Sequence, residues 1–291
     1  VRPFAAITAL LRARGLSAPA LLAGDPAEGF LLIEDLGNDL FARICRNDPA
    51  REPHLYETAI DLLADLHETP PPEMTPPLPD LGMPACRIPP YDTATLLREA
   101  RLVTDWWTPL AAAPLSADAL ADFDAALLAA CAPVESCRDA LVLRDYHAEN
   151  LLWLPGRKGL ARIGLLDYQD ALRGHPAYDL ISLTEDARRD VCPGLADALK
   201  TRYVAMKGLD PATFHEACAV LATQRNLKIV GIFARLAKRD GKRHYLRLIP
   251  RVWAHVQRDL THPALAPLAA LVAHLVPEPT PARLAQAEAA A

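Results

Sequence analysis

In the stretch Asp145-Tyr146-His147-Ala148-Glu149-Asn150, a carboxylate and a carboxamide stand five positions apart. An apolar run precedes this stretch and predicts a strand, Ala140-Leu141-Val142-Leu143. A second stretch, Leu166-Asp167-Tyr168-Gln169-Asp170, places another carboxylate after the apolar run Ile163-Gly164-Leu165-Leu166. The turn-forming sequence Pro155-Gly156-Arg157-Lys158-Gly159 lies between the two stretches. Two strands joined by a tight turn would bring Asp145, Asn150 and Asp167 to one edge of a small sheet.

These three side chains suit phosphoryl transfer from ATP. One carboxylate would accept the proton of the attacking hydroxyl, and a second carboxylate with a carboxamide oxygen would hold magnesium. Each residue taken singly is also a common turn former. The order of the three residues, the apolar run before each stretch and the turn between them favour a phosphotransferase site over three unrelated turns.

The two stretches resemble the catalytic loop and metal-binding hairpin of the kinase-like aminoglycoside phosphotransferase family. The segment Gly174-His175-Pro176-Ala177-Tyr178-Asp179-Leu180 resembles the G-x-P-x-x-D-L motif of that family. The resemblance implies an α+β, protein-kinase-like fold of two lobes, with ATP and Mg²⁺. It implies that Asp145 is catalytic, that Asn150 and Asp167 are metal ligands, and that Asp179 supports the catalytic loop from behind.

Two further residues of the loop have two interpretations each. Arg144 stands where many relatives carry glycine, and it either helps to neutralise charge during catalysis or braces the loop by pairing with an acid. His147 either touches substrate or packs inside, and its titration near neutral pH is the reason to consider the first role.

Residues 29–37 predict a short buried strand that ends in a polar turn. The stretch resembles the last strand of the family's N-terminal lobe and its hinge, which implies that Glu34, Asp35 and Leu36 meet the adenine through backbone groups. The predicted division is a remnant of the N-terminal lobe and hinge over residues 1–36, and a C-terminal catalytic and substrate-binding lobe over residues 37–291.

The phosphate-covering parts of such a lobe are absent from this sequence. There is no Gly-rich loop, and the first 16 residues contain no Asp or Glu to pair with a lysine. We expect roughly 60 to 80 further residues of the lobe upstream of Val1, from typical lobe sizes. The truncated lobe should then expose apolar surface near Phe4, Ile7 and Phe30.

Helical periodicity and composition predict the remaining elements. Residues 70–90 hold nine prolines and predict an extended loop, which we interpret as the rim of a substrate cleft. The tail from Pro277 predicts a loose helix or a frayed end. Apolar residues at helical spacing predict helices over residues 4–14, 54–67, 96–107, 116–131, 179–190, 194–207 and 214–238.

Composition narrows the function classes. The net charge of −5 over 291 residues gives no support for nucleic-acid binding, and no apolar run is long enough to span a bilayer. The six cysteines form no C-x-x-C pair, so neither a zinc site nor a disulfide framework is indicated. We expect a cytoplasmic monomer, and the family resemblance implies that its partner is a small molecule, here a sugar.

The predicted helix over residues 214–238 carries the basic residues Arg225, Lys228 and Arg235, which fall largely on one side. This stripe is either solvated or lines a site. A basic lining would repel polycationic aminoglycosides and suit a neutral or anionic acceptor. Residues 34–37, 166–171 and 231–242 resemble the branch of the family that phosphorylates the anomeric hydroxyl of N-acetylmuramate and N-acetylglucosamine in cell-wall sugar recycling.

The branch resemblance implies that Gln169 and Asp170 also contact substrate. N-acetylmuramate carries an anionic lactyl ether, which gives a basic residue a carboxylate to pair with. Arg235 is the first choice for that residue and Lys228 the second. Two other functions fit the same sequence: an aminoglycoside or other small-molecule kinase of this fold, and a non-catalytic kinase-like binding module that lacks the Gly-rich loop.

Overall fold

The computed structural model describes all 291 residues. The chain forms two compact units, and each is described by itself. The first unit comprises Val1–Pro90, Cys137–Asp186 and Val191–Asp210, and the second comprises Tyr91–Ser136, Ala187–Asp190 and Pro211–Ala291. The lobe boundary predicted between residues 36 and 37 stays a prediction. None of the helices has both the length and the apolar character needed to cross a bilayer.

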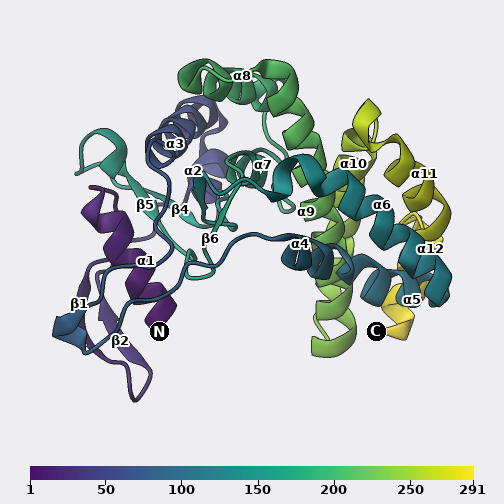
Figure 1. The fold of residues 1–291 in the computed structure, drawn as a ribbon, viewed down its shortest axis with the longest axis horizontal. Coiled ribbons are helices and arrows are strands. Elements are labelled where there is room, and N and C mark those ends of the chain that lie inside the picture. Colours follow the sequence, from purple (N-terminus) through teal and green to yellow (C-terminus); the bar gives the residue numbers. More distant parts are fainter. The chain divides into compact units, whose positions relative to one another are not determined.

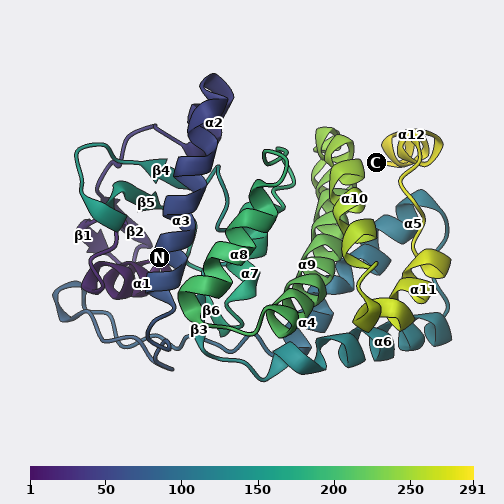
Figure 2. The ribbon, with the colours of Figure 1, turned by 90° about the horizontal axis from the view of Figure 1, so that it is seen from above.

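The first unit holds all the strands together with five helices (Figures 1 and 2). Its helices are α1 (Arg2–Ala13), α2 (Phe41–Asn47), α3 (Glu52–Leu66), α7 (Ala177–Thr184) and α8 (Leu195–Lys207). Its strands are β1 (Leu21–Asp25), β2 (Phe30–Ile33), β3 (Ala140–Val142), β4 (Leu151–Trp153), β5 (Ile163–Leu165) and β6 (Leu172–Gly174).

The strands form three antiparallel pairs, β1 with β2, β3 with β6 and β4 with β5. The predicted hairpin around residues 155–159 is present, but its first strand is β4, with Leu151 opposite Leu165. The prediction that Ala140–Leu143 pairs across this turn is wrong, because Ala140 lies opposite Gly174 of β6. The cause is local: residues 143–150 form turns of their own, including the bond from Asn150 N–H to His147 C=O at 2.8 Å.

The N-terminal helix α1 is anchored by two contacts to the loop after β5. Phe4 stacks on Tyr168 with ring centroids 5.2 Å apart, and the Thr8 hydroxyl lies 2.7 Å from the Tyr168 hydroxyl. Ile7 is buried in this packing, so the predicted exposure of Ile7 is wrong. Burial raises the pKa of Tyr168 to about 12, so the phenol keeps its proton and the bond to Thr8 persists at neutral pH.

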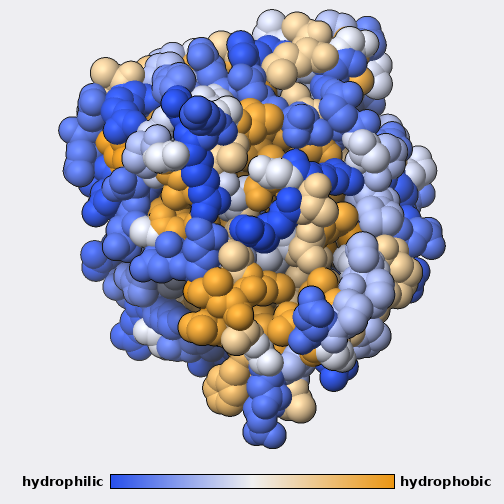
Figure 3. All heavy atoms as spheres, turned by 90° about the vertical axis from the view of Figure 1, so that its left-hand side faces the viewer, coloured by the Kyte–Doolittle hydropathy of each residue, from blue (hydrophilic) through white to orange (hydrophobic).

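The β1–β2 hairpin is apolar and exposed. Phe30 and Leu32 of β2 are 69% and 61% exposed, and Leu22 of β1 is 62% exposed. Figure 3 shows apolar side chains gathered on the side of the molecule that carries this hairpin. The strand predicted within residues 29–37 is therefore present, at Phe30–Ile33, and the exposure predicted for Phe30 is confirmed, but the strand is not buried as predicted. Its partner β1 was missed, because Gly24 and Asp25 weaken the strand pattern.

Most predicted helices are present, with shifted ends. The helix predicted over residues 179–190 stops at Thr184, because the chain turns at Glu185 to bury that carboxylate 3.8 Å from Lys200 Nζ of α8. Periodicity along one helix cannot reveal such a partner. The proline-rich segment is an irregular loop as predicted, with one short 3₁₀ turn at Pro79–Leu81 and isolated bridges such as Met74 with Arg87.

The second unit is entirely helical. The 30-residue helix α9 packs against α4, α6, α10 and the π-helical turn Val103–Trp107, which continues the helix predicted from residue 96 (Figure 2). The C-terminal tail is an ordered helix rather than a frayed end, since Ala287 is buried and Lys238 Nζ donates to the Ala290 carbonyl. The helices of this unit are α4 (Thr93–Ala100), α5 (Thr108–Ala111), α6 (Ala117–Glu135), α9 (Pro211–Asp240), α10 (Ile249–Asp259), α11 (Ala266–Leu275) and α12 (Pro281–Ala290).

Gly231 allows α9 to approach the backbone of Leu102. A Cβ at Gly231 would lie 2.1 Å from the carbonyl carbon of Leu102 and 2.3 Å from its oxygen. Gly231→Ala should lower the free energy of unfolding by about 1–3 kcal/mol, because the added methyl group overpacks the contact with Leu102. This loss exceeds the gain of at most ~1 kcal/mol that alanine brings over glycine within a helix. Urea titration measures this loss. Gly156→Ala, in an exposed turn with nothing within 4 Å, is the control, and a Gly231→Ala protein as stable as that control would contradict the packing argument.

A buried histidine makes the first unit sensitive to acid. His67 follows α3, and its Nδ1 lies 2.8 Å from the Tyr203 hydroxyl. Burial lowers the pKa of His67 from 6.5 to about 3, and burial likewise lowers the pKa of His175 to about 4. The unfolded chain takes up protons below pH 6.5 that the folded protein does not. The stability present above pH 6.5 is therefore lost as the pH falls from 6.5 toward 3.

His67→Gln should reduce the loss of folding stability that occurs when the pH is lowered from 7.5 to 5. At pH 5 each buried histidine lowers the free energy of unfolding by about 2 kcal/mol relative to pH 7.5, at about 1.4 kcal/mol per pKa unit. Urea titrations at the two pH values should show a smaller difference for His67→Gln than for the unsubstituted protein, although the variant is less stable at pH 7.5. Equal losses in the two proteins would contradict a buried neutral His67.

Candidate active site

The loop from Leu143 to Asn150 follows β3 and is held from behind by Asp179 of α7. The Asp179 carboxylate is fully buried and accepts hydrogen bonds from the backbone N–H groups of Leu143 and Arg144, at 2.6 and 2.8 Å. Arg144 adopts a left-handed backbone with φ of 72°, which costs free energy for any residue other than glycine. The charge-assisted bonds to Asp179 offset that cost, and Asp145 is exposed at the turn that follows.

A second anchor fixes the middle of the loop. The buried Tyr146 hydroxyl donates to the Ala59 carbonyl of α3 at 2.8 Å. Burial, together with the nearby charge of Asp179, raises the pKa of Tyr146 well above its ordinary value, so the phenol stays a donor. The loop is thus tied to α7 and α3 while the Asp145 carboxylate makes no hydrogen bond or ion pair within the chain.

Asn150 joins the loop to the end of β5. Its Nδ2 donates to the Asp145 carbonyl at 3.0 Å and lies 3.4 Å from Asp167 Oδ2. The Leu166 N–H also donates to the Asn150 carbonyl at 3.0 Å. Asp167 has a left-handed backbone with φ of 57°, and its Oδ1 accepts from Gln169 Nε2 at 2.6 Å. The structure therefore brings Asp145, Asn150 and Asp167 together, through β4–β5 rather than through a β3 hairpin.

The Asn150–Asp167 pair has the chemistry of a magnesium site. The Asn150 amide nitrogen is engaged, which leaves its Oδ1 as the ligand atom, and Asp167 is an exposed carboxylate. No group of three or more His, Cys, Asp or Glu side chains is placed to hold a metal. Magnesium bound with a nucleotide usually takes one or two protein ligands and completes its shell with phosphates and water. The two residues fit that pattern.

The predicted hinge residues lie after β2. The Glu34 carboxylate accepts from the Ala20 N–H at 3.1 Å and from Arg157, so its side chain is structural. The Asp35 side chain accepts from the Gly37 N–H at 2.7 Å and forms the turn. Neither the N–H nor the C=O of Leu36 has a hydrogen-bond partner within the chain, which leaves both groups for a ligand edge.

The predicted substrate residues divide between the two units. In the first unit His147 is buried, whereas Gln169 and Asp170 lie beside Asp167. The other three lie on α9 of the second unit and differ in their surroundings. Arg225 is buried, Lys228 Nζ lies 3.1 Å from Glu99 Oε2, and the buried Nε of Arg235 has no hydrogen-bond partner. The three residues do not form a uniformly solvated stripe.

Comparison with known proteins gives the family. Residues 1–216 match the family described as "Phosphotransferase enzyme family". The chain belongs to this family. It is 40% identical, over 96% of its length and 76% of the relative's, to the N-acetylmuramate/N-acetylglucosamine kinase of Caulobacter vibrioides. It is 32% identical to the kinase of the same name in Pseudomonas aeruginosa, over 94% of this chain and 78% of that one.

A solved structure shows the same fold at low identity. A choline/ethanolamine kinase family protein from Mesorhizobium loti superimposes with a TM-score of 0.58 and 16% identity, covering 93% of this chain and 81% of that chain. The phosphotransferase therefore has the kinase-like α+β fold predicted from the catalytic stretches.

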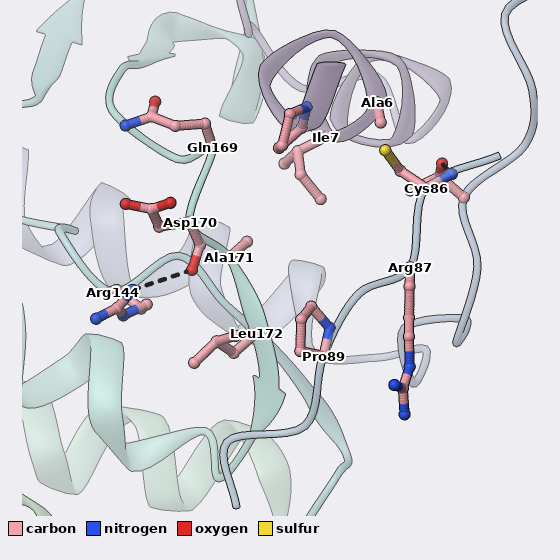
Figure 4. Close-up of a pocket in the computed structure, with 12 residues that line it drawn as sticks. Ala6, Ile7, Cys86, Arg87, Pro89, Arg144, Gln169, Asp170, Ala171 and Leu172 are labelled. Carbon is pink, nitrogen blue, oxygen red and sulfur yellow. Dashed lines mark hydrogen bonds between the residues drawn. The ribbon is translucent and has the colours of Figure 1, made fainter. Parts of the chain in front are cut away.

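The phosphotransferase also has a pocket beside the catalytic loop that sequence reasoning did not locate (Figure 4). Its volume is about 220 Å³. Arg144 Nη1 lies 3.5 Å from the Asp170 carbonyl at one side of this pocket. The signals in the sequence were the predicted site residues Arg144, Gln169 and Asp170, together with the proline-rich segment, interpreted as a cleft rim. The lining residues are Pro3, Ala6, Ile7, Thr75, Cys86, Arg87, Pro89, Arg144, Gln169, Asp170, Ala171 and Leu172.

Proposed function

We propose that this phosphotransferase transfers the γ-phosphate of ATP to the anomeric hydroxyl of N-acetylmuramate and N-acetylglucosamine. The observation that carries the proposal is the 40% identity over 96% of the chain to a kinase named for these two sugars. The site supports it, because Asp145, Asn150 and Asp167 lie together on adjoining turns. We further propose that the reaction takes place in the cytoplasm, where ATP is available and the six free thiols stay reduced.

Asp145 is the proposed catalytic base. Its carboxylate is exposed and has no partner within the chain, so it is free to accept the proton of an incoming hydroxyl. An anomeric hydroxyl is more acidic than an ordinary alcohol, so an unactivated carboxylate is base enough. The anchors of the loop to Asp179 and Ala59 keep the carboxylate in place during this transfer.

Asn150 and Asp167 are the proposed magnesium ligands. Magnesium bound there would neutralise charge on the transferring phosphate. Gln169 orients the Asp167 carboxylate through its 2.6 Å bond. Arg144 contributes a cation directly before Asp145, and the backbone of Asp35 and Leu36 would meet the adenine edge. Of the basic residues on α9, Arg235 is the one without a hydrogen-bond or ion-pair partner. It therefore stays the candidate on that helix for the residue that pairs with the lactyl carboxylate of N-acetylmuramate.

A panel of acceptors tests the proposed function. The protein is incubated with ATP, magnesium and one of N-acetylmuramate, N-acetylglucosamine or kanamycin, and ATP consumption is followed. We expect both amino sugars to be phosphorylated and kanamycin not to be. The products should release phosphate in mild acid, as sugar 1-phosphates do and phosphates on other hydroxyls do not. Transfer to kanamycin but to neither sugar would overturn the acceptor while leaving the phosphotransferase family assignment intact.

A further inference from the structure

The backbone directly before Asp145 makes a tight turn. The Asp145 N–H donates to the Leu143 C=O at 2.9 Å, which closes a three-residue γ-turn centred on Arg144. The φ of 72° at Arg144 is that of the classic γ-turn, which is rare and strained. A residue other than glycine keeps such a conformation only where its surroundings fix it. The direction of the Asp145 side chain therefore depends on the groups that hold this turn.

Helix α7 holds the turn through two buried side chains. Asp179 accepts hydrogen bonds from the N–H groups of Leu143 and Arg144, at 2.6 and 2.8 Å. The Ser182 hydroxyl donates to the Arg144 C=O at 3.0 Å. Residues three positions apart on a helix are neighbours on its surface, so Asp179 and Ser182 reach the same turn. Together they fix both the N–H and the C=O of the strained residue.

Ser182 holds the peptide group that leads into Asp145. This peptide group is planar and consists of the Arg144 C=O and the Asp145 N–H. Its rotation would relieve the strain at Arg144 and would turn the Asp145 side chain to a new direction. The bonds to Asp179 do not directly oppose that rotation, because they lie on the N–H side of Arg144. The bond from the Ser182 hydroxyl opposes it, because it holds the carbonyl that would move.

The burial of Ser182 separates it from the reacting groups. Its side chain is fully buried, whereas the Asp145 carboxylate is exposed. A fully buried hydroxyl does not meet ATP or an acceptor in an open site. Its effect on the reaction must therefore pass through the backbone of Arg144 to Asp145.

We infer that Ser182 is a positioning residue, which aims the Asp145 carboxylate at the incoming hydroxyl by fixing the Arg144 carbonyl. The inference rests on the proposed function, in which Asp145 is the base. Ser182 lies two positions beyond the segment 174–180 that carried the family resemblance. A base displaced by about 1 Å loses much of its effect on the chemical step while the substrates still bind. Loss of Ser182 should therefore lower kcat and leave KM unchanged.

Steady-state kinetics of Ser182→Ala with ATP and N-acetylglucosamine tests the inference. The kcat should fall about five- to fiftyfold, and the KM for each substrate should stay within about twofold. Ser182→Cys keeps the size of the side chain and a weak donor, so it should recover part of the loss. An unchanged kcat in Ser182→Ala would overturn the inference.

Thr184→Val is the matched control. It also removes a buried hydroxyl from α7, but the bond of that hydroxyl, 2.9 Å to the Leu180 C=O, stays within the helix. The kcat of Thr184→Val should stay within about twofold of the unsubstituted value. An equal fall of kcat in Thr184→Val and Ser182→Ala would show that any lost hydroxyl of α7 has this effect, and would overturn the role of Ser182.

A double substitution separates positioning from a general loss of structure. If Ser182 acts through the Asp145 carboxylate, Ser182→Ala should lower the remaining kcat of Asp145→Asn by less than about twofold. A general loss of structure would lower kcat by the same factor with and without Asp145→Asn. The same factor in both proteins would therefore overturn the positioning role.

Hydrogen exchange tests the turn without any acceptor. Backbone N–H groups of residues 143–150 should exchange about five- to fiftyfold faster in Ser182→Ala than in the unsubstituted protein, and at unchanged rates in Thr184→Val. Unchanged rates in Ser182→Ala would overturn the inference whatever the acceptor is. An unsubstituted protein that phosphorylates neither sugar would overturn the proposed function instead, and the exchange rates would still decide whether Ser182 fixes the turn.

Discussion

Asp145→Asn should lower kcat by about two to four orders of magnitude while leaving the fold and the KM for ATP nearly unchanged. The substitution removes the proton acceptor and keeps the shape of the side chain. Asp145 makes no side-chain contact within the chain, so its loss should not disturb the loop, which Asp179 and Tyr146 hold independently. The measurement is steady-state phosphate transfer to N-acetylglucosamine, with circular dichroism to verify folding.

Glu149→Gln is the matched control for Asp145→Asn. Glu149 is a carboxylate in the same loop, four residues further on, and it takes no part in the proposed site. Its replacement should leave kcat within about twofold of the unsubstituted protein. If Asp145→Asn retained turnover in a folded protein, or if the two variants lost turnover equally, Asp145 would not be the base.

Asp167→Asn should abolish magnesium-dependent nucleotide binding and lower turnover by at least about a hundredfold. Asparagine suits this test better than alanine for a structural reason. Asp167 has a φ of 57°, a left-handed conformation that asparagine tolerates more readily than alanine. An asparagine Oδ1 can still accept from Gln169 Nε2, so the loop should keep its shape while the charge that attracts the metal is lost.

Calorimetric titration distinguishes metal binding from a general loss of structure. Asp167→Asn should bind ATP equally weakly with and without magnesium, whereas the unsubstituted protein should bind more tightly when magnesium is present. The thermal midpoint of the variant should stay close to that of the unsubstituted protein. An undiminished effect of magnesium on ATP binding in Asp167→Asn would remove Asp167 from the metal site.

The sequence predicted those parts of the fold that depend on short-range patterns. Amphipathic helices such as α3 and α8 follow from the spacing of their apolar residues, and the irregular proline-rich segment follows from its composition. The catalytic stretch was recognisable because Asp145 and Asn150 lie in one turn and Asp167 follows one hairpin later. Each of these signals lies within a single stretch of about thirty residues or fewer.

Features set by distant partners could not be predicted. The pairing of β3 with β6 and the end of α7 at Glu185 depend on segments that are separate in sequence. Lys228 looked like a free cation on a helix face, but its partner Glu99 lies on another helix. The pocket itself could not be located, because only the fold places the proline-rich segment beside Gln169 and Asp170.

The central claim is that Asp145 accepts the proton of the anomeric hydroxyl of an amino sugar while that oxygen attacks the γ-phosphate of ATP. Phosphorus-31 NMR of the product made from ATP and N-acetylglucosamine tests it most directly, because coupling between phosphorus and the anomeric proton identifies the phosphorylated oxygen. We predict a product signal coupled to the proton at carbon 1, formed by the unsubstituted protein and nearly absent with Asp145→Asn. A phosphorus signal coupled only to protons at another carbon, or the same signal formed equally fast by Asp145→Asn, would contradict the account.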